Sequence, residues 1–175
     1  DHYGASYILA IDKTTGAMIK SQGLGIGSVP RLQALTSKIL VFYNDNHLTP
    51  TIGNLVVRAL DVTTPESGFG AATTVLAAAN AGTEYDATKA DATTAVVVSD
   101  RNPNTSYEVV LVTEALGLTA VTKARTSDGP IAVSLAASVT RVQIVRMSGT
   151  NVQGDLLNSS TLADVFTGQA VGTVA

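Results

Sequence analysis

The side chains best suited to acid–base or metal chemistry are few and isolated. The chain has 175 residues and no cysteine, and its only histidines are His2 and His47. His47 follows Asn44, Asp45 and Asn46, a cluster that could hold a metal ion or transfer a proton. A run of Asn and Asp is more typical of a turn, because these side chains hydrogen-bond their own backbone. No Ser or Cys stands with a base in a triad-like pattern, so we expect no catalytic residue, no metal and no cofactor.

A short glycine pattern has the beginnings of a phosphate-binding loop. Gly23, Gly25 and Gly27 alternate with other residues, but a dinucleotide-binding loop places its third glycine three residues after the second, in a strand-to-helix turn. No Gly-Lys-Ser/Thr sequence occurs either. The spacing therefore favours a flexible connector.

Four aspartates, Asp12, Asp45, Asp61 and Asp100, each follow a predicted strand. Carboxylates gathered at one end of a sheet can bind Ca²⁺, but no spaced acidic loop of the EF-hand kind is present. We expect these side chains to cap turns.

Two tripeptides have the form of N-glycosylation acceptors, Asn104-Thr105-Ser106 and Asn158-Ser159-Ser160. In a chain rich in Ser and Thr, one or two such matches arise by chance. Asn104 and Asn158 are thus candidate glycosylation sites, and a surface glycan is a candidate partner, only if the chain is exported.

The composition is chemically inert. Charged residues make up 14% of the chain, well below the roughly 25% typical of soluble domains, while apolar residues make up 45%. A net charge of -3 with scattered Lys and Arg gives no footprint for nucleic acid, and no apolar run is long enough to span a membrane. The first residue is Asp1, from which we expect a removed leader or a piece of a longer protein. These features favour a structural or binding protein that is extracellular, at the cell surface or in a virion.

Short β-type segments separated by turn signals recur along the whole chain. Val142 and Ile144 alternate with Arg141 and Gln143, which indicates a half-buried strand. Residues 109–112 are apolar on both faces and indicate a central strand. The predicted strands are 3–11, 38–43, 55–62, 95–99, 107–113, 119–125, 131–136 and 139–147. Residues 28–39, 71–81 and 160–168 are open to a short helix or a strand, so we expect an all-β protein with at most minor helices.

A weak internal repeat offers an alternative architecture. Residues 8–15 resemble 57–64 at an offset of 49, and residues 40–45 resemble 95–100 at an offset of 55. Repeats of this length suit the blades of a β-propeller, although the two offsets disagree.

One region resembles a known family. Pro103, Thr105 and Tyr107 follow the pattern that precedes strand F in fibronectin type III and related immunoglobulin-like sandwiches, and the likeness extends over about residues 91–130. The resemblance implies a buried Tyr107 whose hydroxyl bonds the backbone as a tyrosine corner. It implies no catalytic residue. The chain departs from the family in having Arg101 in place of Leu and no core Trp.

Together these observations predict an immunoglobulin-like, Greek-key β-sandwich over residues 17–175, preceded by an N-terminal strand over 1–16 that can act as a donor strand. A propeller fragment is the alternative. The predicted function is a non-enzymatic subunit of an extracellular filament or appendage, a homopolymer assembled head-to-tail by strand insertion. A virion tail or fibre module and a carbohydrate-binding module are the other candidates. The predicted subunit interface is the apolar row Tyr3, Ala5, Tyr7, Leu9 and Ile11, with residues 171–174 as a weaker second candidate.

Overall fold

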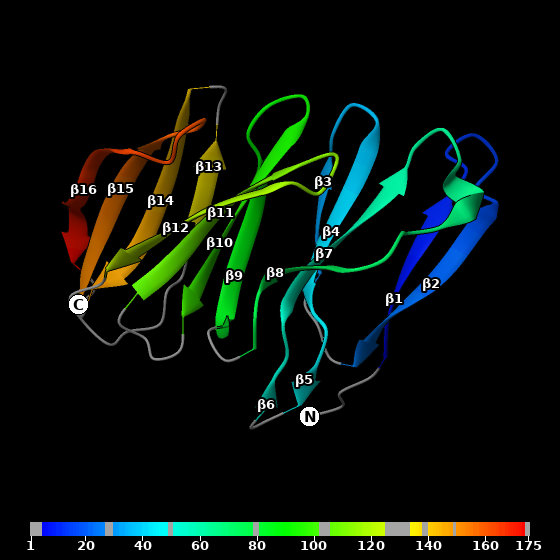
Figure 1. Cartoon of the computed structure of the whole chain (residues 1–175), viewed down its shortest axis with the longest axis horizontal. Coiled ribbons are helices and arrows are strands. Elements are labelled where there is room, and N and C mark those ends of the chain that lie inside the picture. Colours follow the sequence, from blue (N-terminus) through cyan, green and yellow to red (C-terminus); the bar gives the residue numbers. More distant parts are fainter. Residues whose placement is uncertain are drawn as a thin grey trace.

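The described residues of the chain form an all-β protein (Figure 1). The computed structural model describes residues 5–26, 30–48, 51–78, 81–101, 106–124, 134–137, 140–148 and 150–173. Besides strands, these residues contain one 3-10 turn, η1 (Pro65–Ser67). The expected fold class is confirmed. None of the described segments is a helix with the length and hydropathy needed to cross a membrane.

Three four-stranded antiparallel sheets follow one another along the chain. Sheet I contains β3 (Arg31–Ala34), β4 (Lys38–Asn44), β7 (Leu55–Asp61) and β8 (Thr73–Leu76). Sheet II contains β9 (Ala81–Lys89), β10 (Thr94–Arg101), β11 (Ser106–Thr113) and β12 (Leu118–Ala124). Sheet III contains β13 (Ser134–Ala137), β14 (Arg141–Ser148), β15 (Asn151–Asn158) and β16 (Asp164–Thr173).

Two smaller antiparallel pairs complete the described structure. The N-terminal hairpin contains β1 (Ala5–Ile11) and β2 (Met18–Ile26). The strands β5 (His47–Leu48) and β6 (Thr51–Ile52) pair with each other between β4 and β7. In Figure 1 the N-terminal hairpin lies at one end of a row of sheets and sheet III lies at the other.

The sheets pack face to face, and each gap between them holds its own apolar cluster. Side chains from the hairpin and sheet I form the first cluster, Leu24, Val41, Tyr43, Val56, Leu60 and Phe69. Sheets I and II form the second, whose members include Leu40, Phe42, Leu55, Val57, Val97 and Val110. Sheets II and III form the third, which includes Val96, Val98, Val109, Leu111, Val142, Ile144 and Leu157. The sandwich-like packing of antiparallel sheets is therefore confirmed.

The connections within the sheets differ from the expected Greek key. In each four-stranded sheet the neighbouring strands follow chain order, which is a meander. The first strands of the three sheets also contact each other in succession, β3 with β9 and β9 with β13. Propeller blades are also four-stranded meanders, so strand order alone does not separate the two expected architectures, and the face-to-face packing of the sheets supports the sandwich-like one. The physical reason for the meander is that short turns join several of the consecutive strands, such as β3 to β4, β9 to β10 and β11 to β12, so each of these strands pairs with the next one in the chain.

The alternation of side chains explains which strands are buried on both faces. Val96 and Val98 of β10 face sheet III, whereas Val97 faces sheet I, because successive residues of a strand point to opposite faces. The same holds for residues 109–112 of β11, all of them buried. In β14, Val142 and Ile144 are buried, while Arg141 and Gln143 are exposed. Both sequence expectations for these strands are confirmed.

Side-chain oxygens cap several of the turns that separate the strands. The Asp12 carboxylate accepts the backbone N–H groups of Thr14 and Thr15 at 2.8 and 2.7 Å, and Asp61 accepts that of Thr63 at 2.8 Å. Asp45 accepts the N–H of Asn54 at 2.8 Å. Turn capping is thus confirmed at these three aspartates.

Asp100 departs from this pattern. It lies inside β10 opposite Tyr107 and does not follow the strand. The turn after β9 is instead capped by Asp91, whose carboxylate accepts the N–H of Thr93 at 2.8 Å.

The glycine connector was wrong at two of its three positions. Gly23 and Gly25 lie within β2, and Gly27 lies outside the described residues. Tyr7 of β1 packs over Gly23, where an added Cβ would be 3.6 Å from the ring, and Gly25 has a φ of 109°. Gly23 therefore serves close packing of the two strands, whereas Gly25 serves a backbone conformation that other residues rarely adopt. Of the stretches left open between helix and strand, the described parts contain β3, β4, β8 and β16.

Candidate functional site

The N-terminal hairpin carries the predicted interface residues. β1 pairs with β2 of its own chain, and the boundary expected after residue 16 falls in their turn. Ile8 packs on the first apolar cluster. The alternate residues Tyr7, Leu9 and Ile11 point to the other side and are 64%, 53% and 54% exposed. Tyr3 lies outside the described residues, and Ala5 is placed only by its backbone. Three of the five predicted residues thus form an exposed apolar row.

The second edge of β1 is open. Within the described ranges, no strand other than β2 pairs with β1. The pairing register skips Leu24 and Ile19, so both bulges of the hairpin are in β2 and β1 itself is regular. Residues 5–11 contain no charge and no proline. Within its described residues, β1 therefore lacks the charges, prolines and bulges with which many natural edge strands avoid further pairing.

An apolar groove of about 420 Å³ runs beside β1. Leu32 of β3 lies opposite Val41, which belongs to the first apolar cluster, so Leu32 faces the hairpin; yet it is 50% exposed. Among the described residues that line the groove, none is polar or charged. Its walls are Ile8, Leu9, Ala10, Ile11, Ile19, Leu32, Ile39, Leu60, Val62, Pro65 and Phe69. The groove therefore suits an apolar segment laid along β1.

The far end of the row of sheets has a second uncovered apolar surface on β16. Phe166 lies opposite Leu156, the neighbour of the buried Leu157, so both Phe166 and Leu156 point away from sheet II. Val171 lies over Gly154, where an added Cβ would be 3.3 Å from its Cγ2, and Val171 is 62% exposed. β16 is the last strand of sheet III, and residues 165–173 carry no charge.

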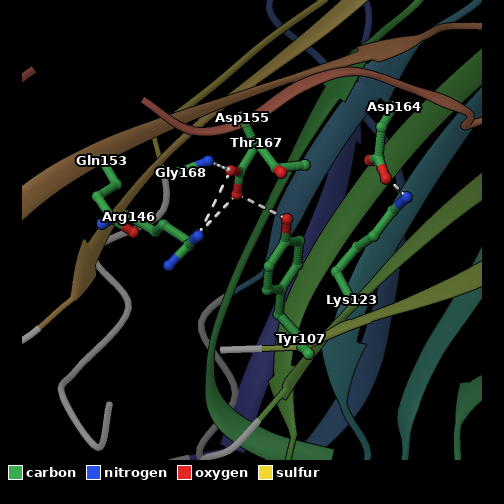
Figure 2. A pocket seen from close by; sticks show the side chains of 9 residues that line it. Tyr107, Lys123, Arg146, Gln153, Asp155, Asp164, Thr167 and Gly168 are labelled. Atoms are coloured by element: carbon green, nitrogen blue, oxygen red, sulfur yellow. Dashed lines mark hydrogen bonds and ion pairs between the residues drawn. The ribbon is translucent and has the colours of Figure 1, made fainter. Parts of the chain in front are cut away.

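A polar cavity of about 340 Å³ lies between sheets II and III, with a buried ion pair at its base (Figure 2). Asp155 of β15 is fully buried and accepts hydrogen bonds from Arg146 Nε at 2.6 Å, the Tyr107 hydroxyl at 2.7 Å and the Gly168 N–H at 2.6 Å. The Arg146 guanidinium also lies 5.8 Å from the centre of the Tyr107 ring. At the rim, Lys123 Nζ lies 2.6 Å from Asp164.

The protonation of this network follows from its contacts. Burial raises the pKa of the Asp155 carboxyl, but the hydrogen bonds from Arg146, Gly168 and Tyr107 outweigh burial and leave that pKa below its usual value. Burial, together with the hydrogen bond to Asp155, raises the pKa of Tyr107 well above its usual value. Asp155 therefore stays ionised and Tyr107 stays neutral near pH 7. Since both oxygens of Asp155 already accept hydrogen bonds, we assign this network to stability.

The network differs from what the sequence led us to expect of Tyr107. Tyr107 is buried, as expected, but its hydroxyl donates to a carboxylate 48 residues away and not to nearby backbone. Pro103 and Thr105 lie outside the described residues. Arg146 and Asp155 were missed, although one signal was present. Each is two residues from an inward apolar side chain, Ile144 or Leu157, and so points to the same face.

The other predicted sites are His47 and the two candidate glycosylation sites. His47 belongs to β5, and its side chain is outside what the structure describes. Asn104 is likewise outside the described residues. Asn158 caps the turn after β15, where its side-chain oxygen accepts the N–H groups of Ser160 and Thr161 at 2.9 and 3.1 Å. Across the described ranges, no group of three His, Asp or Glu side chains is placed to hold a metal ion.

Comparison of the chain with protein-family models, with curated proteins and with solved structures finds no match.

Proposed function

We propose that this chain is a non-enzymatic structural subunit of an extracellular filament or surface appendage, which assembles head-to-tail with its own copies by β-strand addition at β1. The observation that carries the proposal concerns the described residues: β1 is regular and uncharged, has one edge without a paired strand, and lies beside a groove whose described lining is apolar.

Strand addition uses both features of this edge. Main-chain hydrogen bonds to an edge strand supply affinity, and pockets for alternate side chains supply register. The groove beside β1 offers such a pocket at Leu32, and the exposed row at Tyr7, Leu9 and Ile11 extends the apolar surface. An edge of this kind without charge or proline associates unless it is covered.

The ionisable groups that line the polar cavity support a non-enzymatic role. In the cavity between sheets II and III, Asp155 is engaged by Arg146, Tyr107 and Gly168, and Lys123 is paired with Asp164. Such pairing stabilises a fold but leaves no poised nucleophile beside a base. A virion tail or fibre module would share this inert character, and the genes that neighbour the coding sequence distinguish the two settings.

A carbohydrate-binding module is the second candidate, and the polar cavity favours it. Lys123, Gln153 and Thr167 line that cavity and offer donors and acceptors suited to sugar hydroxyls. Tyr107, the aromatic residue of the lining, is buried and presents no open ring face for stacking. A glycan array with saturable binding that Thr167→Val abolishes would establish this role, and no binding would remove it.

The leading proposal is tested by assembly of the full chain and one charged variant. We expect the unmodified chain to form filaments by negative-stain electron microscopy and to sediment as larger species as concentration rises. Leu9→Lys places a charge on the groove and is expected to give monomers, because burying an unpaired ammonium at the contact is costly. The control is Leu118→Lys, the same substitution at an exposed leucine of β12, and this variant should assemble normally. A chain that stays monomeric at every concentration contradicts the proposal.

A further inference from the structure

We infer that the strand received by the edge of β1 is β16 of a second copy of this chain. The inference rests on the proposed function and names the second partner of the head-to-tail contact. Three observations carry it: the place of the groove, the exposed side chains of β16, and the faces on which the neighbouring sheets lie.

The groove excludes a symmetric pairing of β1 with β1. Residues directly opposite each other in antiparallel strands have side chains on the same face of the sheet. If β1 paired with β1 of a second copy by a two-fold axis, the two hairpins would form one sheet. Sheet I of both copies would then lie on the same face of that sheet. Leu32 of sheet I already lines the groove next to Ile8 and Ile11 of β1. Two such sheets would therefore compete for one space. The incoming strand must come from a sheet whose own support lies on the opposite face.

β16 meets this requirement. Sheet II covers one face of sheet III, through Leu157 and Ile144, and leaves the face with Phe166 and Val171 open. When β16 lies along β1 of the next copy with Phe166 and Val171 toward the groove, sheet II of the first copy and sheet I of the second lie on opposite faces. The joined sheet then has apolar cover on both sides.

The chemistry of the two strands is also compatible. Neither residues 5–11 nor residues 165–173 contain a charge, so no ionic group is buried without a partner. β16 has ten residues and β1 has seven, so β16 can cover the whole edge.

This contact uses two different surfaces, one at each end of the row of sheets. It therefore leaves a free groove at one end of every assembly and a free β16 at the other. Such a heterologous contact does not close on itself at two copies and, without ring closure, grows into a fibre.

The test mixes two variants that each lack one surface. Leu32→Asp blocks the groove, and Val171→Asp blocks β16; both side chains are at least half exposed, so the fold should tolerate the changes, which circular dichroism checks. We expect each variant alone to sediment as a monomer. Each variant retains one intact surface, either the groove or β16, but the complementary surface is blocked in every copy of that variant. We expect their equimolar mixture to form a one-to-one dimer and nothing larger, through the intact groove of one and the intact β16 of the other.

The outcomes separate the inference from the proposed function. If the unmodified chain assembles but Val171→Asp assembles equally well, or the mixture stays monomeric, β16 is not the partner and the inference falls while self-assembly stands. If the unmodified chain never assembles, the proposed function itself falls.

Cysteine cross-linking gives a second readout that does not depend on blocked variants. The chain contains no cysteine, so Leu9→Cys can be combined in turn with a cysteine at each position from 165 to 171. Oxidised assemblies should show ladders of disulfide-linked copies only for alternate positions of one face of β16. Leu9→Cys with Leu118→Cys is the control, and ladders of equal strength for that pair would overturn the inference.

Discussion

At the scale of single residues, the ion pair of Arg146 and Asp155 is the most consequential polar contact described. Asp155 is fully buried and Arg146 is nearly so. A buried pair is costly to desolvate, and removing one partner leaves the other charge uncompensated. One nitrogen of the arginine, Nη1, is already buried without a hydrogen-bond partner.

We expect Asp155→Ala to lower the free energy of unfolding by about 3–5 kcal/mol, the usual loss when one partner of a buried ion pair is removed. Asp164→Ala, which breaks the exposed pair with Lys123, should lower it by about 1 kcal/mol or less. Urea denaturation of the two variants measures both changes. Equal losses of unfolding free energy in the two variants would contradict a larger stabilising contribution from the buried pair.

The pKa of Tyr107 makes a prediction for alkaline pH. Burial raises this pKa in the folded state above the value of about 10 expected for an unfolded chain. The tyrosine therefore contributes stability that is fully present below about pH 10 and is lost as the pH rises through the folded pKa. Tyr107→Phe should flatten the fall in unfolding free energy between about pH 10 and 11, measured by urea denaturation.

In the Tyr107→Phe variant, Tyr85 should still cause some fall in the free energy of unfolding at alkaline pH. Burial raises its pKa to about 12, so it contributes alkaline sensitivity of the same sign. A Tyr107→Phe profile identical in slope to that of the unmodified chain would contradict the assignment of Tyr107.

Local contacts between residues were predictable from the sequence, and contacts between distant residues were not. Turn capping by Asp12 and Asp61 was predictable, because Asp followed two or three positions later by Thr is a local pattern. The pairing of Tyr107 with Asp155 was not, since the two residues are 48 positions apart and only the packing of sheet II on sheet III brings them together.

At the scale of elements, the two faces of sheet I include side chains of very different burial. Phe42 of β4 is fully buried between sheets I and II, whereas Leu32 of β3 is half exposed in the groove. We expect Phe42→Ala to cost about 3–5 kcal/mol through lost burial and a cavity. Leu32→Ala should change stability by about 0.5 kcal/mol or less while weakening assembly.

Chemical denaturation measures the stabilities of these two variants, and sedimentation velocity measures their assembly. If Leu32→Ala destabilised the monomer as strongly as Phe42→Ala, Leu32 would be part of the core and the groove would lose its role as a docking surface.

Strands with a dense run of apolar residues were predictable, and strands interrupted by bulges were not. The predicted segments 38–43, 55–62 and 107–113 coincide closely with β4, β7 and β11, because their apolar residues are dense and in register. β2 and β16 escaped prediction. Glycines and register shifts interrupt their pairing, so a period of two residues does not persist along them.

At the scale of the whole molecule, the sheets form a row that is open at both ends. Sheets I and II are covered on both faces, but the hairpin and sheet III are each covered on one. Local sequence patterns indicated many antiparallel strands and not their order, because a meander and a Greek key use the same strand patterns and differ in how distant segments pair. The two weak repeats were the hints. Residues 8–15 and 57–64 both end in an aspartate-capped turn, and residues 40–45 and 95–100 fall in or next to β4 and β10, the second strands of sheets I and II.

The most direct measurement of the proposed contact is hydrogen–deuterium exchange of β1 as a function of protein concentration. In dilute solution the described outer edge of β1 has no paired strand, so we expect the amides of residues 7–11 that point to this edge to exchange rapidly. At concentrations where larger species sediment, the same amides should become protected, together with those of β16, while β12 stays unchanged. Exchange of β1 that is identical in dilute monomer and in assembled material would contradict the use of this edge.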